Sequence, residues 1–345
     1  MKQGYYIDSP EPLRGLMAKH QQVFLLTDDN VQRCCLPLFK SQFGDDFVVI
    51  QLNSGEKHKN LDTVAQIWAK LVEHCADRNA LFINLGGGVV SDMGGFAASC
   101  YNRGIPFVNV PTTLLAMIDA SIGGKTGFDF KGVKNKIGLF ADAEMVYADT
   151  LFLDTLPRRQ LLSGLAEMVK YGFIAAPQLL DANPDNYKSF ISQAVAVKQA
   201  IVADDKRDYG IRRMLNFGHT IGHALEAACL DDGQSMLHGE AVAMGMYCAL
   251  LISHKRHNMP ASLLESYVPT MNMLLGECGA KLTDGIIAEV PQKLIHDKKN
   301  NQKKPVFVLL DAQRNCVFDG DVEEGDVNEA LSNLQSVLSG KKPTP

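Results

Sequence analysis

The sequence has neither an excess of positive charge nor a paired-cysteine motif. Lys and Arg number 34 against 39 Asp and Glu, which gives a formal net charge of −5. A nucleic-acid partner, which requires a basic face, is therefore not indicated. The eight cysteines are scattered and no C-x-x-C pair occurs. We interpret them as thiols of a reducing compartment and expect no cysteine-rich zinc site.

Long apolar segments are also missing. The first residues, MKQGYY, contain no apolar core of a signal peptide. The most apolar stretch, residues 241–253, is too short to cross a bilayer. We therefore expect a cytoplasmic protein without a membrane partner. The 345 residues, 46% of them hydrophobic and 21% charged, are sufficient for two globular domains.

Short apolar runs alternate with helical patterns in the first half of the chain. Residues 61–76 have the spacing of an amphipathic helix. The predicted strands are residues 22–27, 47–50, 81–85, 105–110 and 145–149. Strands that alternate with helices predict a parallel α/β sheet.

Two glycine clusters follow predicted strands. Residues 86–92 (GGGVVSD) connect a strand to a helix, where glycines let the backbone approach a pyrophosphate whose charge a helix N-terminus favours. The cluster lacks the G-x-G-x-x-G pattern, and three glycines also suit a tight turn. Residues 123–127 (GGKTG), with Lys134 and Asn135 close behind, suggest a loop around an anion. A solvated basic turn is the alternative.

The second half is mostly helical and carries carboxylates and imidazoles. Helices are predicted at about residues 158–172, 188–205, 214–229 and 239–257. His219 and His223 stand at i and i+4 and so project from one helix face, and Glu167 and Lys170 are paired similarly. With His238, the one carboxylate and two or three imidazoles form a set suited to a catalytic divalent metal, zinc above all. Spacing alone also fits helices whose polar residues are structural.

Six motifs in order resemble those of the 3-dehydroquinate synthase family, within the sugar-phosphate cyclases. They cover nearly the whole chain and are residues 86–92, 111–116, 119–127, 163–172, 215–223 and 238–240. The resemblance implies an α/β N-terminal nucleotide-binding domain plus a mainly α-helical C-terminal domain. We expect an NAD-binding domain at residues 1–154 and a metal- and substrate-binding domain at residues 155–345.

The resemblance also implies an activity. Family members convert 3-deoxy-arabino-heptulosonate 7-phosphate into 3-dehydroquinate and phosphate, a carbon–oxygen lyase step of the shikimate pathway to aromatic amino acids. The implied cofactors are catalytic NAD and Zn²⁺, with Co²⁺ as a substitute. A homodimer is expected, because the arginine at the place of Arg103 can come from a neighbouring subunit. The alternatives are a related cyclase acting on sedoheptulose 7-phosphate or glucose 6-phosphate, and a metal- and NAD-dependent polyol dehydrogenase.

Site residues are carried over by motif position. The implied metal ligands are Glu167, His219 and His238, which leaves His223 as a pocket residue. The implied NAD contacts are Asp28, Asn30, Glu56, Lys59, Gly87, Gly88, Val89, Val90, Ser91, Asp92, Thr112, Thr113, Lys134, Phe152, Leu153, Asp154 and Thr155. The implied catalytic residues are Asp119, Lys125, Lys170, Lys198, Asp208 and His223. The implied substrate-binding residues are Arg103, Asn135, Arg212, Asn216 and Lys299.

The chain departs from the family pattern at a few positions. Ser91 stands where a glycine is usual, Lys206 reverses a charge, and Asp208 offers a shorter carboxylate side chain than the usual glutamate. Residues 175–193 also form a shorter connection than is usual. None of these departures touches an implied metal ligand.

Overall fold

The computed structural model describes residues 4–301 and 305–343, without the side chains of residues 295–301. The chain forms two compact units. The first holds the residues up to Pro157 together with Ile191–Arg207, and the second holds Arg158–Phe190 and the residues from Asp208 onward. Ile191–Arg207 thus groups with the N-terminal unit, whereas the sequence places everything after residue 154 in the second domain. An ion pair between the buried Lys198 and the half-buried Asp119 holds this segment to the first unit.

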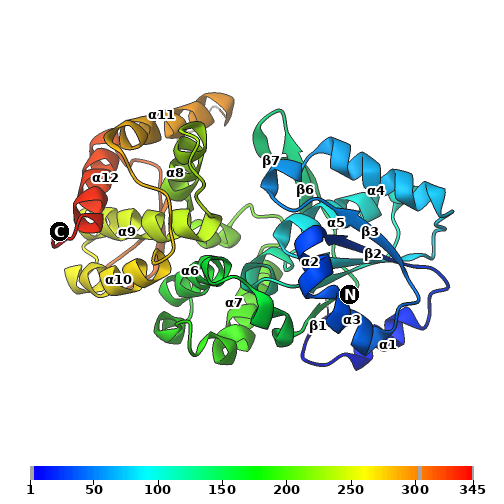
Figure 1. Ribbon diagram of the computed structural model, residues 1–345. Helices are drawn as coiled ribbons and strands as arrows, with labels where there is room; N and C mark the ends of the chain where they lie inside the picture. The colour runs from blue at the N-terminus through cyan, green and yellow to red at the C-terminus, as the bar shows by residue number, and fades with distance from the viewer. Residues whose placement is uncertain (1–3, 302–304, 344–345) are drawn as a thin grey trace. The chain divides into compact units, whose positions relative to one another are not determined.

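The first unit is built on a six-stranded parallel sheet (Figure 1). The strand order is β1-β8-β5-β4-β2-β3. The strands are β1 (Gly4–Ile7), β2 (Val23–Asp28), β3 (Val48–Leu52), β4 (Leu81–Gly86), β5 (Phe107–Pro111) and β8 (Met145–Ala148). The five strands expected from the sequence are therefore present, and β1 is added beside β8.

Helices and one hairpin pack around this sheet. The helices are α1 (Glu11–Met17), α2 (Asp29–Cys34), α3 (Leu36–Phe43), α4 (Leu61–Glu73), α5 (Gly88–Cys100) and α7 (Ile191–Asp204). Apolar side chains of α4 and α5 form one core with β2, β3 and β4. Residues 125–140 form an antiparallel hairpin, β6 (Lys125–Phe130) and β7 (Val133–Phe140), where the sequence suggests a loop. The hairpin packs on α5, with the rings of Phe96 and Phe128 5.1 Å apart.

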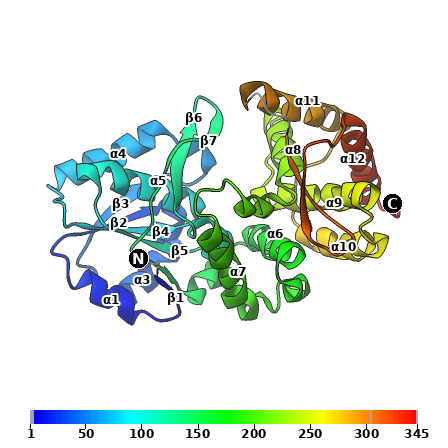
Figure 2. The same ribbon diagram turned by 180° about the vertical axis from the view of Figure 1, so that it is seen from behind.

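The second unit is helical and is organised around α9. Its helices are α6 (Arg158–Ile174), α8 (His219–Asp231), α9 (His238–His257), α10 (Ala261–Leu274), α11 (Asp284–Asn301) and α12 (Glu324–Leu338). A small hairpin of β9 (Phe307–Leu310) and β10 (Cys316–Asp319) completes it. Helix α9 contacts α6, α8, α10, α12 and β9, and both views show it within this group (Figures 1 and 2). Residues 239–253 are accordingly all buried.

The apolar character of α9 follows from this central position. Because neighbours surround it, the helix is apolar on most of its circumference. Among the described residues, no helix has the length and hydropathy needed to span a membrane.

Candidate metal and nucleotide sites

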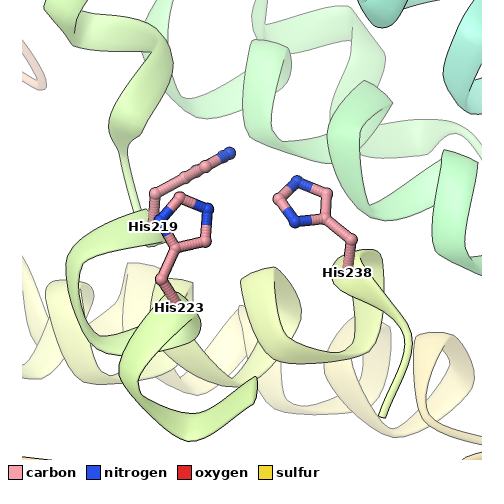
Figure 3. A group of neighbouring side chains, drawn as sticks. All are labelled: His219, His223 and His238. Atoms are coloured by element: carbon pink, nitrogen blue, oxygen red, sulfur yellow. The ribbon is translucent and has the colours of Figure 1, made fainter. Parts of the chain in front are cut away.

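Three imidazoles of the second unit converge at the starts of two helices. His219 is the first residue of α8, His223 follows one turn later, and His238 is the first residue of α9. One ring nitrogen from each lies within 4.8 Å of the others. Figure 3 shows the three rings grouped around a common space. We call these residues, with Glu167, the metal cluster.

Glu167 joins the imidazoles from α6. Its Oε1 atom lies 3.4 Å from His219 Nε2 and 3.3 Å from His238 Nε2. Ligand atoms about 2.0–2.2 Å from a tetrahedral zinc are about 3.3–3.6 Å apart. Glu167, His219 and His238 therefore fit a divalent metal. Lys170 forms an ion pair with Glu167 one turn further along α6, and both side chains are buried.

The cluster contains three imidazoles, whereas the family resemblance implies only two histidine ligands. His223 takes part in the group of nitrogens, but its side chain is exposed. The ring centroids of His223 and His219 are 5.1 Å apart. This position beside the other three residues suits either a fourth ligand or a pocket residue that meets a substrate.

The surroundings of His219 prepare it to bind a cation. Burial lowers the pKa of His219 well below its usual value, and the charge of Lys170 lowers it further. The imidazole is therefore neutral. His219 Nδ1 lies 3.2 Å from the carbonyl oxygen of Phe217, which only accepts hydrogen bonds. Nδ1 thus carries the proton, and Nε2, on the side of Glu167, has a lone pair for a metal.

Two carboxylates favour positive charge at His238. Burial alone would lower the pKa of His238, but interactions with Glu167 and Glu226 outweigh it and raise the pKa to about 9. The same two carboxylates favour a divalent cation at this place, and binding of such a cation would displace the proton. The sequence analysis missed Glu226, although it stands three residues after His223 on the same face of α8.

Close contacts between helix backbones bring the histidines together. A Cβ atom added at Gly245 of α9 would lie 1.9 Å from the carbonyl oxygen of Gly218. One added at Gly222 of α8 would lie 2.8 Å from the carbonyl oxygen of Ala241. Gly218 also has a φ of +78°, which lets the chain turn directly into His219. These glycines allow α8 and α9 to approach closely enough for their first residues to meet.

The first unit gathers most of the expected NAD contacts at one edge of its sheet. Because all six strands are parallel, the loops that follow them lie at the carboxyl edge, where α/β sheets bind ligands. Asp28 ends β2, the turn with Glu56 and Lys59 follows β3, and Thr112 follows β5. Residues 87–92 follow β4, and residues 152–155 follow β8. We call these loops the nucleotide edge. Lys134 is exposed on β7, next to Asn135.

The glycine turn of the nucleotide edge fits a phosphate group. Gly87 is the N-cap of α5, and no side chain in the described part of the protein caps this helix. The first N–H groups of α5 can therefore bind an anion. Added Cβ atoms would lie 3.2 Å from the Thr113 side chain at Gly87 and 3.3 Å from Ala120 at Gly88. The Ser91 hydroxyl donates to the carbonyl of Gly88 (3.0 Å), so it is satisfied within the helix.

A buried lysine links the nucleotide edge to the hairpin. Lys59 Nζ donates to Asp92 Oδ2 and to Asn135 Oδ1, at 2.6 Å in each case. Burial raises the pKa of Asp92 despite the charge of Lys59. Burial would lower the pKa of Lys59, but Asp92 raises it above its usual value. Two expected NAD contacts and one expected substrate contact thus lie together.

A second buried lysine marks the expected substrate side of the first unit. Lys198 Nζ lies 2.5 Å from Asp119 Oδ1. Asp119 belongs to a π-helical turn, Ala116–Ala120, a feature frequent at functional sites. Lys125 is exposed at the start of β6.

Arg103, an expected substrate-binding residue, lies away from the carboxyl edge of the sheet. It is exposed in the turn between α5 and β5, at the amino edge of the sheet. Because α5 runs back across the sheet, this turn lies at the edge opposite the glycine turn.

The remaining predicted site residues lie in the second unit. Lys206, a departure from the family pattern, lies in the first unit. Arg212 is buried and Asn216 exposed in the 3₁₀ turn Ile211–Asn216, which leads into α8. Asp208 has a left-handed φ of +61°. Lys206, in the first unit, forms an ion pair with Asp142, so its reversed charge has a local partner. The side chain of Lys299 lies outside the described residues.

Comparison with known proteins identifies the family. The family model for 3-dehydroquinate synthase N-terminal matches residues 49–163, and that for 3-dehydroquinate synthase C-terminal matches residues 164–300. The chain is 40% identical over 302 residues to a 3-dehydroquinate synthase of Parabacteroides distasonis, with 85% of each protein covered.

Solved structures share the fold. A 2-epi-5-epi-valiolone synthase from Streptomyces hygroscopicus, solved with NAD⁺ and Zn²⁺ bound, is 26% identical over 98% of both chains, with a TM-score of 0.83. A glycerol dehydrogenase from Schizosaccharomyces pombe shares only the fold, at 15% identity and a TM-score of 0.62 over 99% of this chain and 94% of that one. The two family models, which together match residues 49–300, and the 40% identical relative show that the chain belongs to the 3-dehydroquinate synthase family.

Proposed function

We propose that the protein is a 3-dehydroquinate synthase, a carbon–oxygen lyase that converts 3-deoxy-arabino-heptulosonate 7-phosphate into 3-dehydroquinate and phosphate. One observation carries the proposal: Glu167, His219 and His238 meet at the spacing of metal ligands in a chain 40% identical to such a synthase. The catalytic cofactors are NAD and a divalent metal, Zn²⁺ or Co²⁺.

Each cofactor has residues suited to hold it. Glu167, His219 and His238 hold the metal, and the uncapped start of α5 with Gly87 and Gly88 receives the pyrophosphate of NAD. When bound, NAD takes up a hydride from a substrate alcohol and later returns it, while the metal polarises the alcohol oxygen. Asp28, which caps α2 by accepting from the amide of Val31 (2.9 Å), is held where it can contact a ribose.

The charged residues divide according to the groups of the substrate. By motif position, Lys198 and Arg212 are the expected partners of its carboxylate, and Lys125, Asn135, Asn216, His223 and Arg103 those of its phosphate, with Lys299 as a further expected substrate contact. Arginine and lysine donate charge-assisted hydrogen bonds to both groups. Lys170 and Asp119 orient the reacting hydroxyls, and His223 and Asp208 move protons.

The test is phosphate release from the heptulosonate phosphate with NAD and Zn²⁺, with NADH absorbance recorded in parallel. Phosphate release without net NADH is expected, because the hydride is returned to the product. Steady NADH formation would indicate a polyol dehydrogenase instead. Release only from sedoheptulose 7-phosphate or glucose 6-phosphate, which lack the carboxylate, would indicate one of the other cyclases.

We further propose that the enzyme is a homodimer in which Arg103 acts in the neighbouring subunit. Its place at the amino edge of the sheet, opposite the loops expected to hold NAD, supports action outside its own site. Mixing Arg103→Ala with a Lys125→Ala variant should restore activity, since mixed dimers would contain one site with both residues intact. If the mixture stays inactive although sequential affinity purification of differently tagged subunits recovers mixed dimers, this arrangement is wrong.

A further inference from the structure

We propose that Arg159 and Ser163 are positioning residues that set the geometry of the metal ligands by clamping the start of α9 onto α6. The inference rests on the proposed metal site, whose ligands Glu167 and His238 come from these two helices. Arg159, Ser163 and Glu167 stand at i, i+4 and i+8 of α6, and so form one stripe along it. Each member of the stripe contacts the first residues of α9 or the segment just before them.

The first contact is a bidentate ion pair between Arg159 and Glu240. Arg159 Nε donates to Glu240 Oε1 at 2.6 Å, and its Nη2 donates to Glu240 Oε2 at 2.8 Å. The same Nη2 donates to the carbonyl of Ser235 at 2.9 Å. The side chain of Glu240 is 1% exposed, so its charge depends on Arg159. A planar guanidinium fixes both the distance and the direction of a carboxylate, which a lysine ammonium does not.

Glu240 connects Arg159 to the helical turn that carries His238. Its Oε2 also accepts from the backbone amide of Leu237, at 2.7 Å, and so closes the first turn of α9 around His238. Arg159 thus holds the residues on both sides of His238: Ser235 and Glu240 directly, and Leu237 through Glu240. A shift of this turn along α6 would move the imidazole relative to Glu167.

The second contact fixes the position of the start of α9 along the axis of α6. The amide of Gly239 donates to Ser163 Oγ at 3.0 Å. A Cβ atom added at Gly239 would lie 2.0 Å from the carbonyl oxygen of Ser163, so the two backbones touch here. The third contact, one turn further along α6, is Glu167 Oε1 with His238 Nε2 at 3.3 Å. The contact between Glu167 and His238 is therefore the third of three successive contacts between α6 and the start of α9, which we call the junction.

The other end of α9 offers a matched control. Arg256 donates to Asp319 and to Asp326, at 3.0 Å in each case. Its side chain is 27% exposed, against 30% for Arg159. Both arginines tie an end of α9 to acidic partners, but no residue of the metal cluster lies near the end that carries Arg256. Any effect on metal binding confined to Arg159 must come from its place in the junction.

The experiment is a Co²⁺ titration of the full chain without NAD or substrate, followed by visible absorption and by competition with a chelator. The variants are Arg159→Lys, Ser163→Ala and Arg256→Lys, and thermal unfolding is measured for each. We expect Arg159→Lys to weaken Co²⁺ binding by about 10- to 100-fold, the range for loss of a partner outside the ligand shell. Ser163→Ala should weaken it less, and both should alter the Co²⁺ absorption bands. Arg256→Lys should lower the melting temperature but leave affinity and bands unchanged.

The outcomes separate this inference from the proposed function. If the unmodified protein binds no Co²⁺, the metal site itself is wrong, and the inference fails with it. If the unmodified protein binds Co²⁺ and both α6 variants match it in affinity and spectrum, the metal site stands and the positioning role is wrong. If Arg256→Lys weakens binding as much as Arg159→Lys, the effect is general loss of stability, which also overturns the inference.

Discussion

At the nucleotide edge of the first unit the expected phosphate site is made of backbone, whereas the metal cluster of the second unit is made of side chains. At the nucleotide edge, parallel strands deliver successive loops to one place, and the start of α5 contributes N–H groups. In the metal cluster, Glu167, His219 and His238 come from three different helices. These side chains meet only because the helices pack at the correct distance and rotation.

This difference changes what a glycine does in each place. At Gly88 an added Cβ would lie 3.3 Å from the Cβ of Ala120, a tight contact that a shift of a few tenths of an ångström relieves, and the lack of a side chain leaves the backbone open to a ligand. Gly239 has no space, because an added Cβ would lie 2.0 Å from a carbonyl oxygen of α6. Substitution should therefore affect ligand binding at the first and folding at the second. The following predictions test that contrast.

The largest effect should come from removing a ligand. His219→Ala should reduce metal affinity by more than the about 10- to 100-fold that follows loss of an outer partner, and turnover should fall with it. NAD affinity should not change, because the nucleotide edge belongs to the other unit. Metal content after dialysis, phosphate release and calorimetric NAD titration measure the three quantities. His20→Ala, at a half-buried histidine of the first unit, is the control. Retention of metal by His219→Ala would exclude the cluster as the site.

The junction glycine should give the next largest effect. Gly239→Ala should destabilise the protein by about 3 kcal/mol, the upper part of the range for overpacking a tight contact. Denaturant unfolding of the metal-free protein measures this without involving the ligands. Gly325→Ala is the control, since nothing lies within 4 Å of an added Cβ in the first turn of α12. That variant should be neutral or more stable, by about 0.4–1 kcal/mol at most. Equal stability of the two variants would contradict close contact between α6 and α9.

The fold and the site differ in how far the sequence could predict them, because local patterns reveal strands and helices but not contacts between distant residues. The four interior strands β2, β4, β5 and β8 were predictable because buried parallel strands are continuous apolar runs, and the edge strand β3 was predictable from the apolar residues at its start. β1 was missed because it is only four half-buried residues long, and β7 because all eight of its residues are exposed. The i, i+4 spacing showed His219 and His223 on one face, but the choice of Glu167 and His238 as ligands came from the family resemblance. The Arg159–Glu240 pair spans 81 residues, and no local pattern predicts such a contact.

A smaller effect is expected at the glycine turn. Gly88→Ala should fold normally, because Ala120 needs to move by only a few tenths of an ångström. The added methyl group would occupy the approach to the start of α5, so NAD should bind about tenfold more weakly, equivalent to about 1.4 kcal/mol. Calorimetric NAD titration measures this, and Co²⁺ affinity should remain that of the unmodified protein. Unchanged NAD affinity would show that this turn does not receive the pyrophosphate.

The smallest effect should come from Ser91, the residue that departs from the family glycine. Its hydroxyl is bonded to the carbonyl of Gly88 within α5, so it neither blocks the helix start nor points a free donor at a ligand. Ser91→Gly should therefore change NAD affinity by less than about twofold, or about 0.4 kcal/mol. Glycine within a helix should lower stability by about 0.5–1 kcal/mol. Ser99→Gly is the matched control, since its hydroxyl donates to the carbonyl of Gly95 at 2.6 Å, near the far end of α5. If NAD affinity rose several-fold in Ser91→Gly alone, a side chain would be shown to limit a site that we describe as made of backbone.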